Sequence, residues 1–449
     1  MTTEAQTPAS AGDLIPSTLQ QPIALRFWLA VLLTGVGTGL GAIALTRLLE
    51  VTQHFAWRGS PTDILDAAQQ ASPSRRIVVL LAAALLTGVG QLLLKQLSSA
   101  NGIDTTAAIW FHAGRLPALR TLGSAVLSVL IVGLGVSLGR EGAPKQAGAV
   151  FANFFSDKER LSDEQRRLLV ACGAGAGLGA AYGVPLGGAL FALEVMRGKL
   201  ALRYVLPALF ASMVATGVSW FVLPNAPTYA IPAYVSSSPI IFWALIMGPI
   251  AGLASVAYVR LVTWAYRHRP EGWRRLLAPI IIMGSLGVAS IWVPQILGNG
   301  KDVSQLLFTG QVAPLLMLAL LALKPAATIL CMRSGAPGGL FTPSLTAGAL
   351  LGGVMGLLWS HLWPGAPLGL YALLGAGAVL GATTQGPIST VVLMMELTGR
   401  ARSFILPLLL VVAIATIVAR SVEPRSIYDA RLTDEEIAER QRLRDQPAQ

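Results

Sequence analysis

One stretch of this chain occurs twice, first as Gly173-Ala-Gly-Ala-Gly-Leu-Gly-Ala-Ala-Tyr-Gly-Val-Pro185 and again as Gly375-Ala-Gly-Ala-Val-Leu-Gly-Ala-Thr-Thr-Gln-Gly-Pro387. The copies align without a gap at an offset of 202, and the match extends to Glu194 and Glu396. Nine positions are identical, and because the proline and the glutamate are among them, a shared Gly/Ala composition does not explain the match. The pattern therefore predicts two related halves.

A second pair of segments supports this duplication. Gly139-Arg-Glu-Gly-Ala143 corresponds to Gly339-Leu-Phe-Thr-Pro343 at an offset of 200. We expect halves of about 23–220 and 221–430. Two halves with interrupted helices at equivalent places are typical of transporters whose substrate binds where the halves meet.

The composition places most of the chain in lipid. Of 449 residues, 54% are apolar and only 12% are charged, against about 25% in soluble domains. These values exclude a water-soluble globule, a coiled coil and a disulfide scaffold, and they predict an all-α polytopic membrane protein. Residues 1–22 are expected to form a disordered tail, 23–430 the transmembrane domain, and 431–449 a short charged tail or soluble helix.

The net charge of +11 does not indicate nucleic-acid binding, because no basic stretch is interleaved with aromatic residues. Lys and Arg cluster between the apolar runs instead, as is typical of cytoplasmic loops beside anionic lipid. These clusters are Arg75-Arg76, Arg166-Arg167, Arg197-Gly198-Lys199, Arg267 to Arg275 and Arg400 to Arg402.

Several apolar runs are too short to cross a bilayer. The runs 145–155, 185–196 and 386–398 fall below the 17 or so residues that a span requires, so we expect broken or re-entrant helices. Gly-rich loops that open such helices expose backbone N–H groups at a positive dipole end, which favours an anion. Three segments fit this description: 100–104, 139–143 and 335–343.

Glu141 is the carboxylate embedded among these loops. An ionisable side chain inside a membrane segment is expensive and indicates function. Our interpretation is that ionised Glu141 occupies the N–H groups that would hold the anion, and that protonation opens the path. The alternative is a structural ion pair with Arg140.

These residues resemble the ClC family of chloride channels and chloride/proton antiporters over about 24–430. Gly139-Arg140-Glu141-Gly142 resembles the family's GREGP motif, Gly339-Leu340-Phe341-Thr342-Pro343 its GxFxP motif, and Ala100-Asn101-Gly102-Ile103-Asp104 a degraded GSGIP. The resemblance implies an inverted-repeat, all-helical protomer in a homodimer, with one chloride path per subunit.

The resemblance also implies roles for individual residues. Glu141 would be the external gating glutamate. Tyr428 would contact the anion with its hydroxyl, where the alternative is an ordinary interfacial anchor. The remaining anion-binding residues would be Asn101, Gly102, Ile103, Arg140, Gly142, Gly339, Leu340 and Phe341.

Two positions in the segment that resembles GSGIP depart from the family. Asn101 stands where the family has an anion-coordinating serine, which puts the anion preference in doubt and leaves nitrate or fluoride as less favoured substrates. Asp104 replaces the motif proline. It is most simply a helix N-cap, and otherwise a proton carrier.

A third departure bears on mechanism. Many antiporters of the family carry two consecutive glutamates before Met-Arg, of which the second is the internal proton-transfer site. Here the pair is Glu194 and Val195, and Val195 cannot take a proton. Glu194 matches Glu396 in the other half, which favours a structural carboxylate, with a place on a proton path as the alternative.

We expect chloride/proton exchange gated by Glu141, with a passive chloride channel as the alternative because of Val195. No hydrolase constellation occurs in the sequence, so we expect a transporter and not an enzyme. No cofactor or metal is expected, only the transported chloride and protons. The expected location is the bacterial inner membrane.

Overall fold

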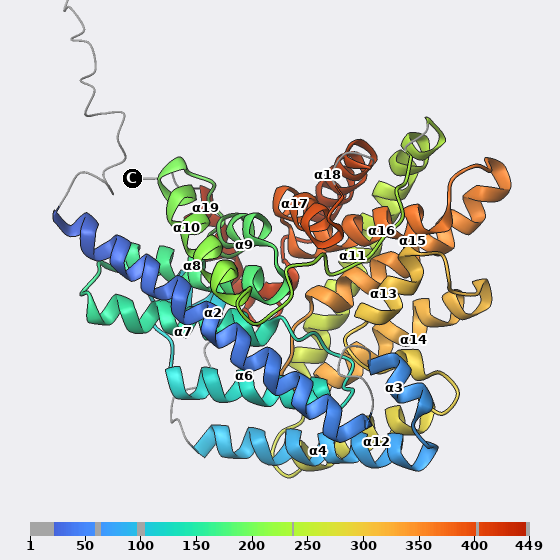
Figure 1. Ribbon diagram of the computed structural model, residues 1–449, viewed down its shortest axis with the longest axis horizontal. Helices are drawn as coiled ribbons and strands as arrows, with labels where there is room; N and C mark the ends of the chain where they lie inside the picture. Colours follow the sequence, from blue (N-terminus) through green and yellow to red (C-terminus); the bar gives the residue numbers. More distant parts are fainter. Residues whose placement is uncertain (1–21, 59–63, 97–103, 236–237, 401–403, 446–449) are drawn as a thin grey trace, which may run out of the picture.

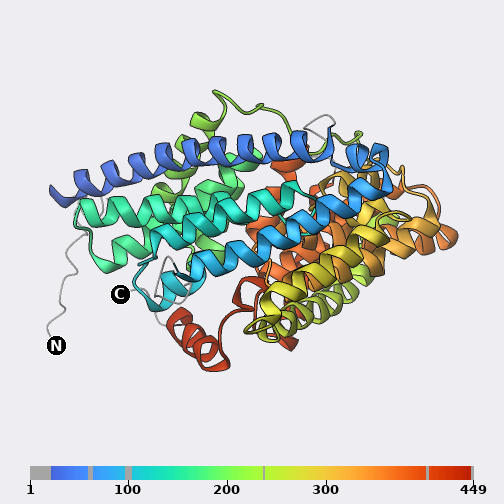
Figure 2. The ribbon, with the colours of Figure 1, turned by 90° about the horizontal axis from the view of Figure 1, so that it is seen from below.

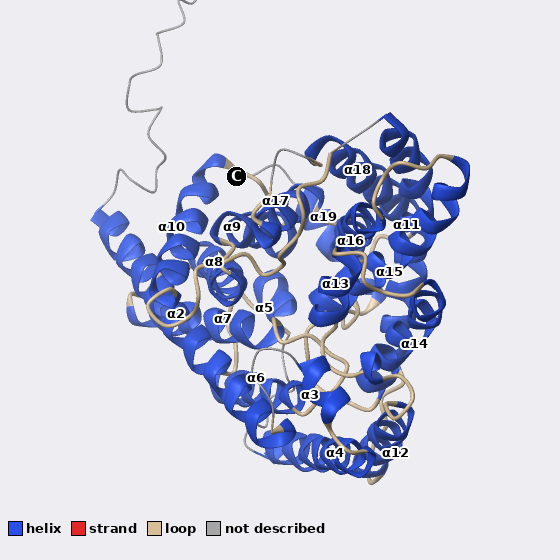
Figure 3. Cartoon of the chain, turned by 45° about the vertical axis from the view of Figure 1, so that its right-hand side comes forward, coloured by secondary structure: helices blue, strands red, loops and turns tan. Residues whose placement is uncertain are grey.

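Helices make up most of the structure that is described (Figure 3). The computed structural model describes residues 22–58, 64–96, 104–235, 238–400 and 404–445. The predicted N-terminal tail lies outside this range, except for Pro22, and so do Asn101, Gly102 and Ile103. The all-helical prediction is confirmed.

The first half of the chain runs from α2 to α10. Its elements are α2 (Pro22–Trp57), α3 (Ile64–Gln70), α4 (Pro73–Gln96), α5 (Thr105–Phe111), α6 (Ala118–Gly133), α7 (Gly142–Lys158), α8 (Asp163–Tyr182), α9 (Pro185–Phe191), the π-helical η2 (Ala192–Arg197) and α10 (Leu202–Ser219).

The second half repeats this order from α11 onward. Its elements are α11 (Ser238–Arg267), α12 (Arg274–Ala289), η3 (Pro294–Ile296), α13 (Lys301–Phe308), α14 (Pro314–Arg333), α15 (Phe341–Leu362), α16 (Leu368–Thr384), α17 (Pro387–Thr398) and α18 (Ile405–Val422), followed by η4 (Ile427–Asp429) and α19 (Asp434–Asp445).

The two halves lie side by side, with α3 and α4 reaching across to pack near α12 (Figure 1). Gly139 and Gly339, which are equivalent by the sequence repeat, form an antiparallel bridge with two N–H···O bonds of 2.8 Å. Equivalent residues that pair in antiparallel fashion are related by a two-fold axis, as in an inverted repeat. The second membrane half is thus an inverted counterpart of the first.

Close helix contacts explain why both copies of the repeat are rich in Gly and Ala. A Cβ on Gly148 of α7 would overlap the carbonyl oxygen of Gly173 on α8, and a Cβ on Gly348 of α15 would overlap that of Gly375 on α16. The small residues therefore let each pair of backbones touch, which is the packing that membrane helices favour.

Seven of the described helices are long and apolar enough to cross a membrane, namely α2, α4, α10, α11, α14, α15 and α18. Two of the three runs predicted to be too short form short elements, since 185–196 is α9 with η2 and 386–398 is α17. The third run, 145–155, lies within the continuous 17-residue helix α7. The helix α17 has 12 residues and therefore extends about 18 Å, and α9 has seven. Each is shorter than the hydrocarbon core of a bilayer, about 30 Å, so neither crosses it alone.

A basic face forms around Trp110 and the C-terminal helix α19, which lies along one edge of the molecule in Figure 2. The guanidinium groups of Arg197 and Arg440 both lie over the Trp110 ring, and Arg267 and Arg425 both pair with Asp434. The charged C-terminal segment thus forms a helix that docks against the membrane domain.

Not every basic cluster marks the same side, so that part of the sequence analysis is wrong. Arg75 and Arg76 lie at the N-terminal end of α4. Arg269, from another basic cluster, lines a cavity with Gln91 and Leu94 near the C-terminal end of the same helix. The two clusters therefore lie at opposite ends of α4. Arg76 is buried and donates to carbonyls of Gln69, Ala71 and Ser290. Its guanidinium satisfies backbone carbonyl groups that have no partner within the helix at the C-terminal ends of α3 and α12.

Candidate functional site

Glu141 lies where the two halves meet, at the N-cap of α7. The bridge between Gly139 and Gly339 holds the two motif loops together beneath its carboxylate. A Cβ on either glycine would overlap that carboxylate, so the close approach requires glycine at both positions. The two equivalent motif loops of the repeat therefore form the binding place of the Glu141 carboxylate, which we call its seat.

The carboxylate of Glu141 is 97% buried and accepts hydrogen bonds on both oxygens. Oε1 accepts from the backbone N–H groups of Phe341 (2.6 Å) and Thr342 (3.3 Å), at the start of α15. Oε2 accepts from the hydroxyls of Thr342 and Tyr182, each at 3.3 Å. The negative group thus occupies amides at the positive end of a helix, where an anion would otherwise bind.

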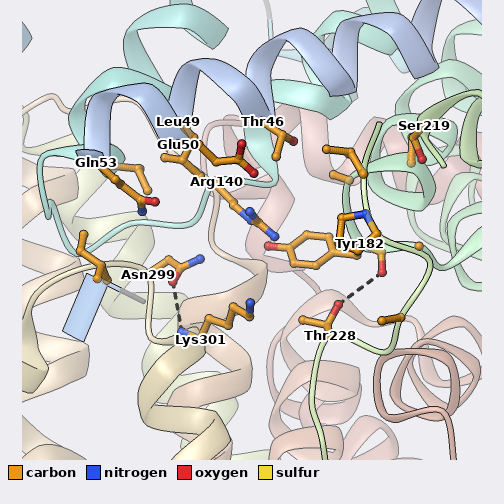
Figure 4. Close-up of a pocket in the computed structure, with 18 of the residues that line it drawn as sticks. Thr46, Leu49, Glu50, Gln53, Arg140, Tyr182, Ser219, Thr228, Asn299 and Lys301 are labelled. Carbon is orange, nitrogen blue, oxygen red and sulfur yellow. Dashed lines mark hydrogen bonds between the residues drawn. The ribbon is translucent and has the colours of Figure 1, made fainter. Parts of the chain in front are cut away.

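Arg140 does not pair with Glu141 in the structure. Its guanidinium lies over the ring of Tyr182, 5.1 Å from the ring centre. Arg140 and Tyr182 together line a cavity of about 220 Å³ on one side of Glu141, the outer pocket, which Glu50, Lys301 and Thr228 also line (Figure 4). The alternative of an ion pair with Arg140 therefore has no support.

A second cavity, the inner pocket, lies beside the motif loops that hold Glu141. Its volume is about 50 Å³, and it is lined by Gly142, Gly339 and Leu340 of the motif loops and by Tyr428. The ring of Tyr428 packs edge-on against Phe191, with 5.4 Å between centres. Of the described residues predicted to touch the anion, one lines the outer pocket and four line the inner pocket, whereas Phe341 lines neither. The carboxylate of Glu141 contacts Tyr182 of the outer pocket and lies against Gly339 of the inner pocket.

Asp104 is an N-cap, as its position in the sequence suggested. Its carboxylate accepts from the Thr106 amide at 2.9 Å and pairs with Arg431 at 2.9 Å. Burial alone would raise the pKa of Asp104, but Arg431, Lys145 and Thr106 together hold that pKa below its usual value. Asp104 is therefore ionised at neutral pH.

Each of the two repeated glutamates caps the N-terminus of a short helix in the opposite half of the protein. Glu194, in η2, accepts from the amides of Ile388 (3.2 Å) and Ser389 (2.6 Å) at the start of α17. Glu396, in α17, accepts from Leu186 (3.1 Å) and Gly187 (2.6 Å) at the start of α9. This reciprocal capping supports the structural interpretation of Glu194.

Paired variants distinguish capping from proton transfer. Glu194→Gln and Glu396→Gln each replace a charged cap by a neutral one, so we expect each to destabilise the protein by about 1–2 kcal/mol. Thermal unfolding in detergent measures this loss. If Glu194 carried protons, Glu194→Gln alone would reduce proton movement in liposomes, and Glu396→Gln would not.

Sequence reasoning missed Tyr182, Thr342 and Lys145. Tyr182 is the tyrosine inside the repeated stretch, where the second copy has Thr384, and this difference between the copies was the available signal. Thr342 lies within the predicted motif, but its hydroxyl was not considered. Lys145 is the single charged residue of the run 145–155. Only the structure shows that these side chains face the path.

Tyr182→Phe tests the hydroxyl contact with Glu141. The hydroxyl stabilises the ionised carboxylate in its seat, so its removal should make protonation easier. We expect the pH at half-maximal flux to rise by about one unit. Tyr204→Phe is the matched control, because it removes a tyrosine–carboxylate bond to Glu164 (2.9 Å) away from both pockets. An unchanged pH profile in Tyr182→Phe would show that the hydroxyl plays no part in the gate.

Two inverted halves and a carboxylate seated on helix N-termini between two pockets define a polytopic membrane transport protein. The chain matches the voltage gated chloride channel family over residues 84–420, and it belongs to this family, also called ClC.

Bacterial proteins are among its curated relatives. A putative chloride channel protein, ClcB-like, of Ralstonia nicotianae is 31% identical, with 86% of this chain and 93% of that protein aligned. The H(+)/Cl(-) exchange transporter ClcA of Citrobacter koseri is 29% identical over 94% of this chain and 91% of its own length.

Solved structures share the fold at lower identity. A slow cyanobacterial Cl-/H+ antiporter superposes with a TM-score of 0.79 at 22% identity, covering 94% of this chain and 99% of its own. A CLC-type fluoride/proton antiporter superposes with a TM-score of 0.73 at 22% identity, covering 91% and 98%. The predicted ClC-like fold is confirmed.

Proposed function

We propose that this protein moves chloride across the membrane in exchange for protons, with Glu141 as both the gate and the outer proton acceptor. The observation that carries the proposal is the seat of Glu141. Its carboxylate accepts hydrogen bonds from the Phe341 and Thr342 amides, which would otherwise bind an anion. It also contacts Tyr182, which lines the outer pocket, and lies against Gly339, which lines the inner pocket.

Protonation couples the gate to the proton gradient. A neutral carboxyl group binds backbone amides more weakly than a carboxylate does, so a proton that reaches Glu141 from the outer pocket releases the amides to chloride. Tyr182 lies between that pocket and Oε2, and its hydroxyl both donates and accepts, so it supports this route.

A passive chloride channel is the second candidate function. Val195 is buried, and it has no proton to exchange at the place where many relatives carry a glutamate. The relative from Ralstonia nicotianae is named a putative chloride channel, whereas that from Citrobacter koseri is named an exchange transporter. Fluoride remains a less favoured substrate, and one similar structure is that of a fluoride/proton antiporter.

We propose further that the protein is a homodimer in a bacterial inner membrane, with the basic face toward the cytoplasm. The basic face fits the positive-inside rule. The short helices α9 and α17 and the neighbouring α10 and α18 expose apolar side chains that a partner subunit or lipid must cover, including Leu186, Leu202, Ile388 and Leu406.

Liposomes that contain the purified protein test the function. An outward chloride gradient should drive protons inward against their own gradient, which a pH dye inside the vesicles records. Uphill proton movement supports exchange. Rapid chloride flux without it would show a channel, and absence of chloride flux would contradict both.

A further inference from the structure

The inner pocket contains an ammonium group with unused hydrogen-bonding capacity. Lys145 lies in the first turn of α7, four residues after Glu141, and lines the inner pocket together with Gly339 and Tyr428. Its Nζ lies 4.1 Å from the centre of the Tyr428 ring. An ammonium offers three donors. Within the described ranges of the chain, Nζ of Lys145 has neither a hydrogen bond nor an ion pair, so these donors face the pocket.

The charges around this ammonium balance while Glu141 is ionised, because Asp104 and Glu141 both act on Lys145, and they leave a positive excess once Glu141 is protonated. Arg431 and Asp104 also line the inner pocket, and they are joined by an ion pair of 2.9 Å. The other carboxylate oxygen of Asp104 accepts a hydrogen bond from the Thr106 amide. The pocket thus contains two cations and one anion from these three side chains, and the carboxylate is engaged by partners other than Lys145.

The inner pocket is also large enough for an anion. Its volume of about 50 Å³ has room for one small anion or one or two waters. The backbone of Gly142, Gly339 and Leu340 forms the wall next to the seat of Glu141. An anion that leaves the amides of α15 toward this pocket therefore meets Lys145 and Tyr428.

We propose that Lys145 binds the transported anion at the inner mouth of the path, and that Asp104 is a fixed competing charge that keeps this binding weak. The identity of the anion, chloride, rests on the proposed function. A conducting path needs sites that attract ions and still release them. The ammonium supplies the attraction, and the nearby carboxylate limits it.

Isothermal titration of the purified full-length protein with chloride tests this site. Lys145→Met should weaken binding about tenfold or more, the loss expected for one hydrogen bond to a charged group. Lys145→Arg keeps the charge and should stay within about threefold. Asp104→Asn should tighten binding severalfold, because it removes the competing charge, while Asn remains a good N-cap.

The opposite signs of these effects separate binding from a structural role. Damage to the fold would weaken binding in every variant, whereas the proposal requires Asp104→Asn to bind more tightly. Asp104→Asn also keeps the test decisive if Lys145→Met does not fold. Arg115→Gln is the control for general charge, since it removes an exposed guanidinium paired with Asp163.

Chloride affinity that is unchanged in Lys145→Met, or weakened in Asp104→Asn, would overturn the proposal. Flux in liposomes reports on the proposed function separately. Variants that behave as expected in titration while the native protein moves no chloride would leave the anion site in place and refute transport. Normal chloride flux, with chloride affinity unchanged in Lys145→Met, would support transport and refute the anion site.

Discussion

Glu141→Gln should abolish proton movement and leave a chloride flux that no longer changes with pH. The amide side chain is isosteric with the protonated acid but cannot ionise. Hydrogen bonds to a charged group contribute about 1.5–3 kcal/mol and neutral ones about 0.5–1.5 kcal/mol. With two backbone amides on Oε1, the side chain should lose about 2 kcal/mol of its hold on the seat.

That loss corresponds to about a thirtyfold shift toward the open path. Chloride efflux from liposomes at several pH values, measured together with proton uptake, records both effects. Glu439→Gln is the control, because Glu439 is an exposed carboxylate on α19, and its flux should keep the native pH profile. A Glu141→Gln flux that stays low at neutral pH and rises on acidification would mean that another group is the gate.

Lys324→Met should give the largest loss of stability. Lys324 is 99% buried in α14, and its ammonium donates to the carbonyls of Ile296 (3.0 Å), Leu297 (2.8 Å) and Gly298 (2.7 Å). Methionine fills a similar volume but donates nothing. Each buried carbonyl left without a donor costs about 1–3 kcal/mol, so we expect the three together to cost about 3–9 kcal/mol.

Lys324→Met should also disturb the lining of the outer pocket. The turn held by Lys324 leads directly to Asn299 and Lys301, which line that pocket (Figure 4). Thermal unfolding in detergent measures the loss of stability, and Leu323→Met, on the exposed side of the same helix, is the matched control. Equal melting temperatures for the two variants would show that the three hydrogen bonds contribute no net stability.

The sequence identified much of the fold because the relevant signals are local or repeated. The short run at 386–398 became α17 at Pro387–Thr398, since a proline begins it and a glycine follows it. The interpretation of Arg75-Arg76 failed because arginines also satisfy carbonyls at buried helix ends, and hydropathy does not distinguish that role from a membrane border.

The candidate site was predicted in part. Glu141, the motif glycines and the Phe341 amide meet as the pattern indicates, because both motif loops are equivalent positions of the repeat. Tyr182 and Lys145 were missed. Tyr182 follows a run of small and apolar residues in α8, and Lys145 follows Gly142-Ala-Pro144 in α7. What such a side chain faces depends on how its helix is rotated against its neighbours.

By itself, the sequence determined the duplication, the helical membrane class and the embedded carboxylate, because repeats, hydropathy and missing counter-charges are properties of the chain. The tertiary structure decided which groups converge on the carboxylate. It brings the Tyr182 hydroxyl and the α15 amides to opposite oxygens of Glu141, and places the Lys145 ammonium in a pocket beyond it. These contacts join residues far apart in the chain, so their geometry follows from helix packing, which no local pattern specifies.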